Sequence, residues 1–501
     1  MSQLLGLCHE LLHNIFTQLD PSDLASVSRS CRPLNRYVKN NKLLFKELYL
    51  QRWDDPSPTA DGAEPDWEFE LPKLVAFQKL LESSNTTLSI ADITQHVTTL
   101  LSTAATGSTH SLNVAFLARI FKQPHTKYLL LCNSSLYEAG EVHLNAHYQN
   151  SSRPILSSAP MAGRERQLSA KLHCLYGVPI DVNWKVSDRS ETLDATESME
   201  AVTKIYRCIN PYARSRVYDL RRYTEQTFWG PFVDDASEHV DWEMLESIMV
   251  VLGYNLGMFS ERTRGLFGPV WDKPFEGAVP GSFVPPPKEE PFCSKHTRHD
   301  SGLAEVPALI KEPSLSLDAR DPYGVTGTWR RVVCFLDYND FYRFNFSDSR
   351  PLPLSTSRPP ITTQEAIRLI TLKLHVTKIE PPQPHTPHSL PTVHFKGTSR
   401  SMHSHWDPNA NSTIVGTVSP TVEGEIRWTT LSVFFGEARW RSEGIQVGGP
   451  RSARGVIGTW FDKDYDEHGP CGPTAFWKIS DDEGYCKCPG GGQEDGLDES
   501  D

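Results

Sequence analysis

Residues 6–24 read GLCHELLHNIFTQLDPSDL, and their pattern predicts a short helix that ends at an Asp-Pro turn. The apolar side chains recur at steps of three and four residues, which places them on one helix face: Leu11, Leu12, Ile15, Phe16 and Leu19. Proline is tolerated in the first turn of a following helix, and Ser or Asp can cap that helix. The stretch therefore predicts one helix, a stop at Pro21 and an immediate restart.

Two further apolar stretches follow this helix and complete a small unit. A second predicted helix, over residues 25–38, carries the apolar face that begins just before it, at Leu24, Val27, Ser28, Cys31 and Leu34, and a third covers residues 43–50. So small a unit leaves much apolar surface exposed, because it has little interior in which to bury it. The surplus of apolar side chains implies a partner.

Together these residues resemble the F-box, a three-helix module that docks a receptor onto the Skp1 adaptor of a cullin–RING ubiquitin ligase. The Leu-Pro pair that usually opens the motif stands here as Leu7-Cys8. The alternative is an ordinary helical cap that packs on the rest of the chain. The resemblance implies Skp1 contacts at Leu11, Leu12, Ile15, Phe16, Leu19, Pro21, Leu24, Val27, Cys31 and Leu34.

The composition limits the kinds of partner. The 501 residues suffice for two or three domains, and a hydrophobic content of 38% is that of a soluble globular protein. We find no run near the roughly 18 to 20 apolar residues that span a bilayer, and no secretory signal. A net charge of -12 argues against nucleic acid as a main ligand. Ten scattered cysteines are typical of reduced thiols, so we expect a cytoplasmic or nuclear protein without a membrane partner.

The chain is expected to be an α+β protein in five parts. Helical spacing continues after the F-box, and short apolar runs between residues 112 and 232 predict strands. Residues 240–253 predict a helix that stops at Gly253. The predicted parts are an F-box (1–52), a helical stalk with a β-rich region (66–262), a partly disordered linker (263–321), a β-barrel-like substrate domain (322–480) and a disordered acidic tail (481–501).

The predicted β-domain carries a recurring Gly-Thr pair that we expect at strand starts. Glycine permits a tight bend, and the Thr, Val and Trp residues that follow favour strands; the pairs begin at Gly327, Gly397, Gly416 and Gly458. Several short strands at this spacing predict a mainly antiparallel sheet, closed as a barrel or folded as a sandwich. Residues 324–329 resemble the opening strand of calycin-type barrels. Residues 451–477 are similar to the end of the substrate domain in cyclin-D-binding F-box receptors and related fungal F-box proteins.

The segment 425–444, in which Trp and Arg residues are interleaved at 427–428 and 439–441, predicts the target contacts, because these residue types are enriched in interface hot spots. Arginine can also grip a carboxylate with its planar fork. The alternative is that the tryptophans form the barrel core and the arginines pair with Glu425, Glu437 and Glu443. The candidate target-binding residues are Trp428, Arg439, Trp440, Arg441, Arg451 and Arg454.

No segment predicts a metal, a cofactor or a catalytic residue. Donor residues occur at 293–300, 403–407, 462–468 and 486–488, but their spacings and surroundings favour polar loops over metal sites. A phosphate-binding loop and a Gly-x-Ser-x-Gly motif are both missing from the sequence.

The sequence therefore predicts a non-catalytic substrate-recognition subunit of a Skp1–cullin–F-box ubiquitin ligase. Its partners would be Skp1, cullin through Skp1, and an unknown target protein held by the β-domain. Such a receptor acts by raising the effective concentration of the target near the conjugating enzyme. Two alternatives stay open: a Skp1-binding scaffold outside the ligase, and a calycin-like barrel that binds a small apolar ligand. An enzyme is the least favoured class.

Overall fold

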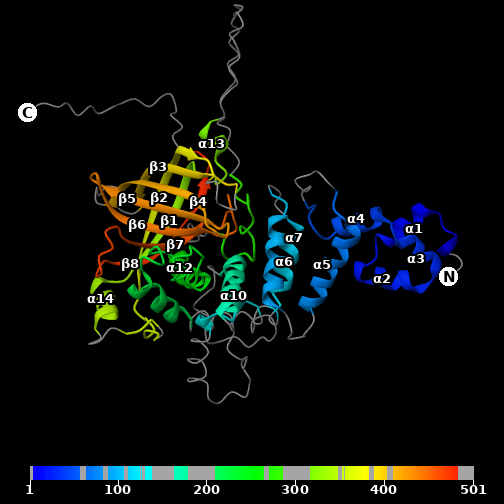
Figure 1. The fold of residues 1–501 in the computed structure, drawn as a ribbon, viewed down its shortest axis with the longest axis horizontal. Helices are drawn as coiled ribbons and strands as arrows, with labels where there is room; N and C mark the ends of the chain where they lie inside the picture. The colour runs from blue at the N-terminus through cyan, green and yellow to red at the C-terminus, as the bar shows by residue number, and fades with distance from the viewer. Residues whose placement is uncertain are drawn as a thin grey trace, which may run out of the picture.

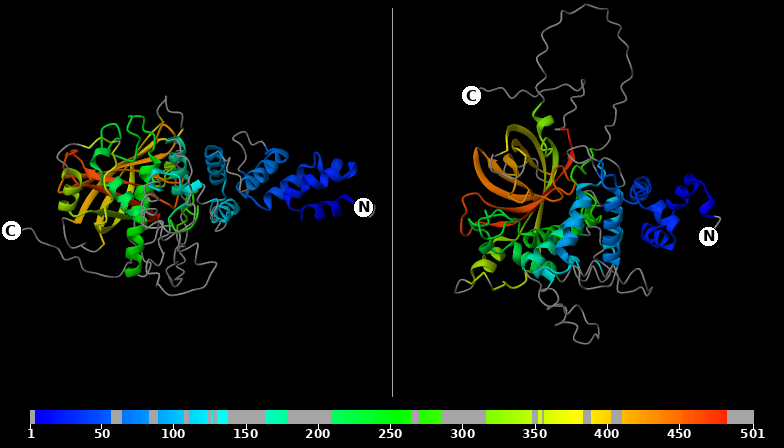
Figure 2. Two further views of the ribbon diagram at one scale, coloured as in Figure 1. Left: turned by 90° about the horizontal axis from the view of Figure 1, so that it is seen from below. Right: turned by 45° about the vertical axis from the view of Figure 1, so that its right-hand side comes forward.

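The structure is a computed structural model, and it describes residues 4–56, 64–82, 89–106, 111–123, 126, 130–137, 163–178, 209–263, 270–285, 316–347, 352–354, 356–382, 389–402 and 410–482. Figure 1 shows an elongated molecule with the N-terminal helices at one end of its long axis. A β-barrel with surrounding helices occupies the other end, and Figure 2 shows the same arrangement from two further directions. The fold is thus α+β, as predicted.

Residues 9–50 form four short helices, α1 (His9–Phe16), α2 (Pro21–Ser30), α3 (Arg32–Val38) and α4 (Lys42–Leu50), after a single 3-10 turn, η1 (Leu4–Gly6). The predicted restart at Pro21 is present, because the Asp20 side chain accepts a hydrogen bond from the Ser22 amide and caps α2. The stretch expected as one second helix is two helices. Pro33 has no N–H to continue the preceding helix, so Cys31 is extended and α3 begins anew.

Three longer helices connect this unit to the rest of the molecule: α5 (Trp67–Glu82), α6 (Ile90–Ser102) and α7 (Leu112–Phe121). The junction is made by Asp54, which is buried. Its carboxylate accepts hydrogen bonds from the amides of Ala105 (3.0 Å), Leu112 (2.9 Å) and Asn113 (3.3 Å). Two of these amides lie in the first turn of α7, where no intrahelical partner exists. The N-terminal unit is therefore fixed to α7 by a charged cap.

The prediction of strands between residues 112 and 232 is wrong for the part of that range that the structure describes. It holds α7, α10 (Gly163–Tyr176) and the short η2 (Leu220–Arg222), with a single isolated bridge between Phe232 and Val240. A short apolar run does not distinguish a buried helix from a strand, and α10 is buried along its last two turns. Residues 138–162 and 179–208 of that range lie outside the described residues.

The helix predicted to stop at Gly253 continues as α12 (Trp242–Thr263). Gly253 serves close packing instead, because a β-carbon there would lie 2.6 Å from a methyl group of Val178. α12 packs on α10 and along the last two strands of the barrel.

The predicted linker is also partly wrong. Trp271, Phe275, Ala278 and Val279 are buried in the main core, so residues 270–285 are a packed segment. Prolines and charged residues surround these four residues in the sequence, so the local pattern did not indicate that they are buried. Residues 286–315, residues 383–388 and all but the first two residues of the predicted tail lie outside the described residues.

Eight antiparallel strands close into a barrel in sequence order, because β1 pairs with both β2 and β8. The predicted barrel is confirmed, although three of the four Gly-Thr pairs lie inside strands. There a β-carbon would collide with the backbone of the next strand. The strands are β1 (Gly327–Phe335), β2 (Ala366–Glu380), β3 (Thr392–Ser401), β4 (Asn411–Pro420), β5 (Ile426–Phe434), β6 (Glu437–Gln446), β7 (Val456–Asp462) and β8 (Cys471–Ser480).

Aromatic side chains fill one half of the barrel. The Trp428 ring lies 5.2 Å from Trp329, 5.4 Å from Phe476 and 5.4 Å from Phe395, measured between ring centroids. Two short helices lie outside the barrel wall: α13 (Leu317–Arg320) precedes β1, and α14 (Tyr338–Phe346) connects β1 to β2. α14 stands at the other, unfilled end of the barrel.

Among the residues that the structure describes, no helix combines the length and apolar character needed to cross a membrane.

The aromatic half of the barrel predicts that a substitution of Trp428 lowers the stability of the protein. Replacement of Trp428 by Ala should lower the free energy of unfolding by about 3–5 kcal/mol, because it leaves a large cavity in a closed core. Chemical unfolding followed by circular dichroism measures this loss. Trp440→Ala, at a half-buried tryptophan of the same barrel, is the matched control and should have a clearly smaller effect. Equal losses for the two variants would contradict this description of the core.

Candidate functional site

The ten residues predicted to bind Skp1 divide between the interior and the surface. Leu19, Val27 and Cys31 are partly buried. Leu11 and Ile15 are exposed by 49% and 40%, and they lie four residues apart on the same face of α1. Half of the predicted contacts are buried in the unit's own interior: Leu12, Phe16, Pro21, Leu24 and Leu34. In this structure they hold the four helices together, and direct Skp1 contact at these five positions stays a prediction.

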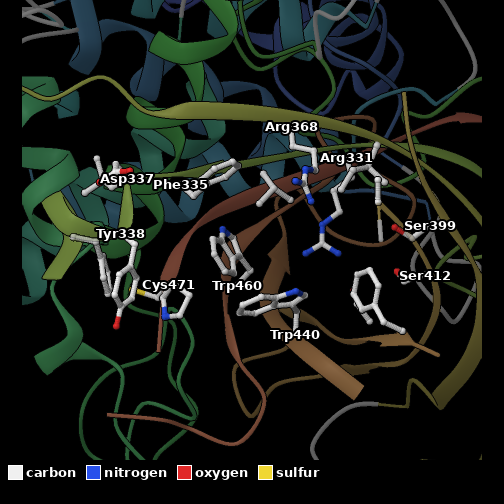
Figure 3. A pocket seen from close by; sticks show the side chains of 18 residues that line it. Arg331, Phe335, Asp337, Tyr338, Arg368, Ser399, Ser412, Trp440, Trp460 and Cys471 are labelled. Atoms are coloured by element: carbon white, nitrogen blue, oxygen red, sulfur yellow. The ribbon is translucent and has the colours of Figure 1, made fainter. Parts of the chain in front are cut away.

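A pocket opens at the end of the barrel opposite the aromatic half, and it encloses about 410 Å³. Its walls are mainly apolar, with Phe335, Phe434, Trp440 and Trp460 among them. The rings of Trp440 and Trp460 meet edge to face at 5.2 Å. Figure 3 shows Arg331 and Arg368 on one side of this space, with Trp440 and Trp460 facing them and the hydroxyls of Ser399 and Ser412 to the side.

Arg331 stands out among the groups that line the pocket. Its side chain lies in the barrel interior and is only 4% exposed. The guanidinium donates hydrogen bonds from Nε to the hydroxyl of Thr474 (3.0 Å) and from Nη2 to the hydroxyl of Ser442. Within the described residues no carboxylate pairs with it, since Asp337, the acidic residue of the lining, instead caps α14. A buried cation that meets only hydroxyl groups and lines a pocket can form a charge-assisted hydrogen bond with an anion that enters it.

Burial lowers the pKa of Arg331 to about 10, because the charged form loses its water. The folded chain therefore holds this proton less tightly than the unfolded chain does. At every pH below about 10 the buried charge thus counts against folding, and an anionic ligand would remove that penalty.

Arg454 shows what a structural arginine looks like in the same chain. It is fully buried, and its Nη2 donates to the carbonyl oxygens of Glu276 (2.9 Å), Lys273 (3.3 Å) and Tyr176 (3.4 Å). Burial lowers its pKa to about 10 as well, although Asp272 and Glu276 oppose that shift. Arg454 joins the barrel to α10 and to residues 270–285. Its assignment as a target contact is therefore wrong.

Two more of the candidate target contacts have surroundings that belong to the fold. Trp428 is enclosed in the aromatic half, so its assignment is wrong. Arg441 is held by the buried carboxylate of Glu443 (2.6 and 2.9 Å) and by the hydroxyl of Tyr465 (2.8 Å), which fits the alternative that these arginines form ion pairs.

The remaining three candidates keep some exposure. Trp440 is in the pocket wall. Arg439 is exposed, and its guanidinium lies 5.8 Å from the ring of Phe434, another wall residue. Arg451 is exposed beside Gly324, before the start of β1, at the far end of the barrel. The structure thus places Trp440 in the pocket wall and Arg439 next to that wall, and it leaves Arg451 at the other end of the barrel.

Sequence reasoning missed Arg331, although β1 carried a signal. Successive side chains of a strand point to opposite faces of the sheet, and β1 contains two adjacent arginines, Arg330 and Arg331. In a closed barrel one of the two must therefore point inward. Which one, and whether it meets an acid, depends on strands far away in the sequence.

No group of three His, Cys, Asp or Glu side chains within the described residues is placed to hold a metal ion. The acidic turn at 462–468 is a series of local hydrogen bonds, in which Asp462 accepts from the Asp464 amide and Asp466 from the His468 amide. The candidate donors at 293–300, 403–407 and 486–488 lie outside the described residues.

Comparison with known proteins identifies one part of the chain. Residues 6–51 match the F-box-like domain family, which supports the expectation of an F-box protein. No curated protein and no solved structure matches the chain. An F-box domain implies Skp1 as a partner in general and suggests an adaptor role, and F-box proteins are generally non-catalytic.

The two buried arginines predict opposite responses to one substitution. Arg331→Met should leave the free energy of unfolding unchanged or raise it by about 1–3 kcal/mol, because it removes a buried charge without an acidic partner. Arg454→Met should lower it by about 2–4 kcal/mol, because three carbonyl groups lose their donor. Chemical unfolding of the two variants in parallel measures both changes. A large loss of stability in Arg331→Met would show that Arg331 is structural.

Proposed function

We propose that this chain is a substrate-recognition subunit of a Skp1–cullin–F-box ubiquitin ligase. The observation that carries the proposal is the F-box-like match at residues 6–51. In this role the chain binds Skp1 at one end, takes a target protein into the barrel-end pocket at the other, and works in the cytoplasm or nucleus.

The Skp1 side of the proposal is supported by the exposed face of α1. Leu11 and Ile15 place apolar surface in water at the outer end of the molecule, and α4 adds Leu43, which is also exposed. Exposed apolar groups gathered on a small unit mark an interaction site. Leu12 and Phe16 contribute indirectly, because they hold α1 in place against α2 to α4.

The target side is supported by the chemistry of the pocket. A planar guanidinium in an apolar space matches a carboxylate better than a neutral group, because two parallel N–H donors can meet its two oxygens. Aromatic walls around that charge fit apolar side chains next to the carboxylate. The pocket therefore suits a short segment of a target protein that carries one carboxylate among apolar residues.

The placement of the two sites suits a receptor that acts by proximity. Figures 1 and 2 show the F-box-like helices and α14 at opposite ends of the long axis. Skp1 and a target would therefore not compete for space. The Asp54 cap and the packed helices between them fix the two sites in one orientation. The chain thus holds the target near the conjugating enzyme and supplies no bond-making chemistry.

A second candidate function is favoured by the unfilled half of the barrel. A pocket of about 410 Å³ with aromatic walls falls in the range that holds small ligands. An apolar molecule with a carboxylate would satisfy Arg331 as a peptide segment does. In that case the F-box would be an accessory to ligand binding.

The Skp1 proposal predicts the effect of two charges on α1. The double variant Leu11→Asp, Ile15→Asp should abolish co-purification with Skp1 and cullin, because unpaired carboxylates would be buried at the interface. Both positions are exposed, so the fold and its thermal midpoint should be retained. Leu317→Asp, at an exposed leucine beside the barrel, is the control and should bind Skp1 normally. Skp1 binding that survives the double substitution would refute this docking face.

The receptor proposal predicts that turnover of target proteins depends on Arg331. Proteins whose abundance falls when the wild-type chain is expressed should be stabilised by Arg331→Met, although this variant still binds Skp1. Quantitative proteomics with and without cullin activity measures this. Turnover that persists without cullin would favour the scaffold alternative, and turnover that ignores Arg331→Met would exclude the pocket as the target site.

A further inference from the structure

The tip of the β5–β6 hairpin has an unusual sequence for its shape. Phe434 and Glu437 are its last paired residues, so Phe435 and Gly436 alone make the turn. Both have positive φ angles, 50° and 85°, which is the type I′ geometry of two-residue hairpins. That turn favours Asn-Gly or Asp-Gly, because a bulky side chain in the left-handed region is strained.

Phe435 is unfavourable for a second, independent reason. Its side chain is 75% exposed, more than any other large apolar side chain in the described part of the chain. Neither the strain nor the exposure stabilises the folded protein. Features of this kind gather where a protein binds something.

The position of Phe435 indicates what it could bind. The preceding residue, Phe434, is part of the pocket wall. In a ring of eight strands the β5–β6 hairpin lies diametrically opposite the β1–β2 connection, which is α14. α14 presents Tyr338 and Tyr342 to solvent, and Tyr338 also lines the pocket. Figure 3 shows Tyr338 and Ser412, a residue of the neighbouring strand β4, on opposite sides of the pocket. Aromatic side chains therefore flank the mouth on both sides.

The strand register gives the distance between the position of Arg331 and that of Phe435. Arg331 bonds to the hydroxyl of Ser442, and Ser442 pairs with Thr430 across β5 and β6. Phe435 lies five residues beyond Thr430, which is about 16 Å at the rise of an extended chain. A peptide in extended conformation spans that distance in about five residues.

We propose that Phe435 forms a second specificity subsite of this pocket, which binds an aliphatic or aromatic side chain of an extended target segment. That side chain would lie four or five residues from the carboxylate held by Arg331. The inference rests on the proposed function, because it assumes that the pocket receives a target segment. The positive charge of Arg331 selects the carboxylate, and the register distance sets the spacing.

The test uses the full-length protein, Skp1 and two sets of unlabelled glycine–serine peptides in calorimetric titrations. Each peptide carries one Leu, placed one to eight residues before a single carboxylate. The carboxylate is the free C-terminus in one set and a Glu side chain ahead of an amidated end in the other. Affinity should peak at a spacing of four or five residues. Phe435→Asn should weaken the best peptide about tenfold and leave a peptide without Leu unchanged.

The same substitution separates binding from stability. Phe435→Asn creates the preferred Asn-Gly turn, so its thermal midpoint should rise while its affinity falls. Val422→Asn, at an exposed valine in the β4–β5 turn at the far end of the barrel, should bind like the wild type. Affinity that is independent of spacing and of Phe435, yet lost in Arg331→Met, would overturn the subsite and keep the pocket. If no peptide of either set binds, both the proposed binding of a target segment in the pocket and the Phe435 subsite are refuted.

Discussion

The pairing of β1 with both β2 and β8 is the constraint on which the rest of the structure depends. Closure removes every free sheet edge, and it also creates an interior that eight strands must share. Trp329, Trp428 and Phe476 occupy one half of that interior and leave the other half open. The pocket is therefore a direct result of where the large side chains fall along the strands. Arg331 lies in this pocket because successive side chains of β1 point to opposite faces of the sheet and that of Arg331 points inward.

Arg331 and Arg454 show that burial alone does not reveal the role of a charged group. Both pKa values fall to about 10 for the same physical reason, the loss of water around the guanidinium. Their partners differ, because Arg454 meets three carbonyl groups, whereas Arg331 meets two hydroxyls. Arg454 lies away from the pocket and bonds to backbone carbonyls through Nη2 alone, while its Nε and Nη1 have no hydrogen-bond partner among the described residues. Arg331 lines the pocket, so its guanidinium is within reach of a molecule that enters there.

The sequence predicted features that depend on local order. The stripe on α1, the cap at Asp20 and the antiparallel barrel could be predicted, because each is encoded by periodicity or by turn residues within one segment. Which stripe residues face outward could not, since Leu12 and Phe16 become interior only through α2 to α4. The same limit applies to the predicted linker. Trp271 stands among polar residues in the sequence, but distant strands bury its side chain. A ligand-binding barrel was one of the alternatives that the sequence left open, but the lining of the pocket could not be predicted, because it comes from residues 331–471 and is brought together only by closure.

Two features of the barrel work against stability: Arg331 lines the pocket, and Phe435 directly follows Phe434, a residue of the pocket wall. Arg331 near its base is a buried charge without an acidic partner, and Phe435 at its rim is an exposed aromatic residue in a left-handed turn. Other non-glycine residues of the barrel loops, Arg451 and Tyr465, also have positive φ angles. Phe435 differs from them because it is also the most exposed large apolar residue in the described part of the chain. The extended ligand that we propose would contact both residues, and selection for its binding would account for their retention.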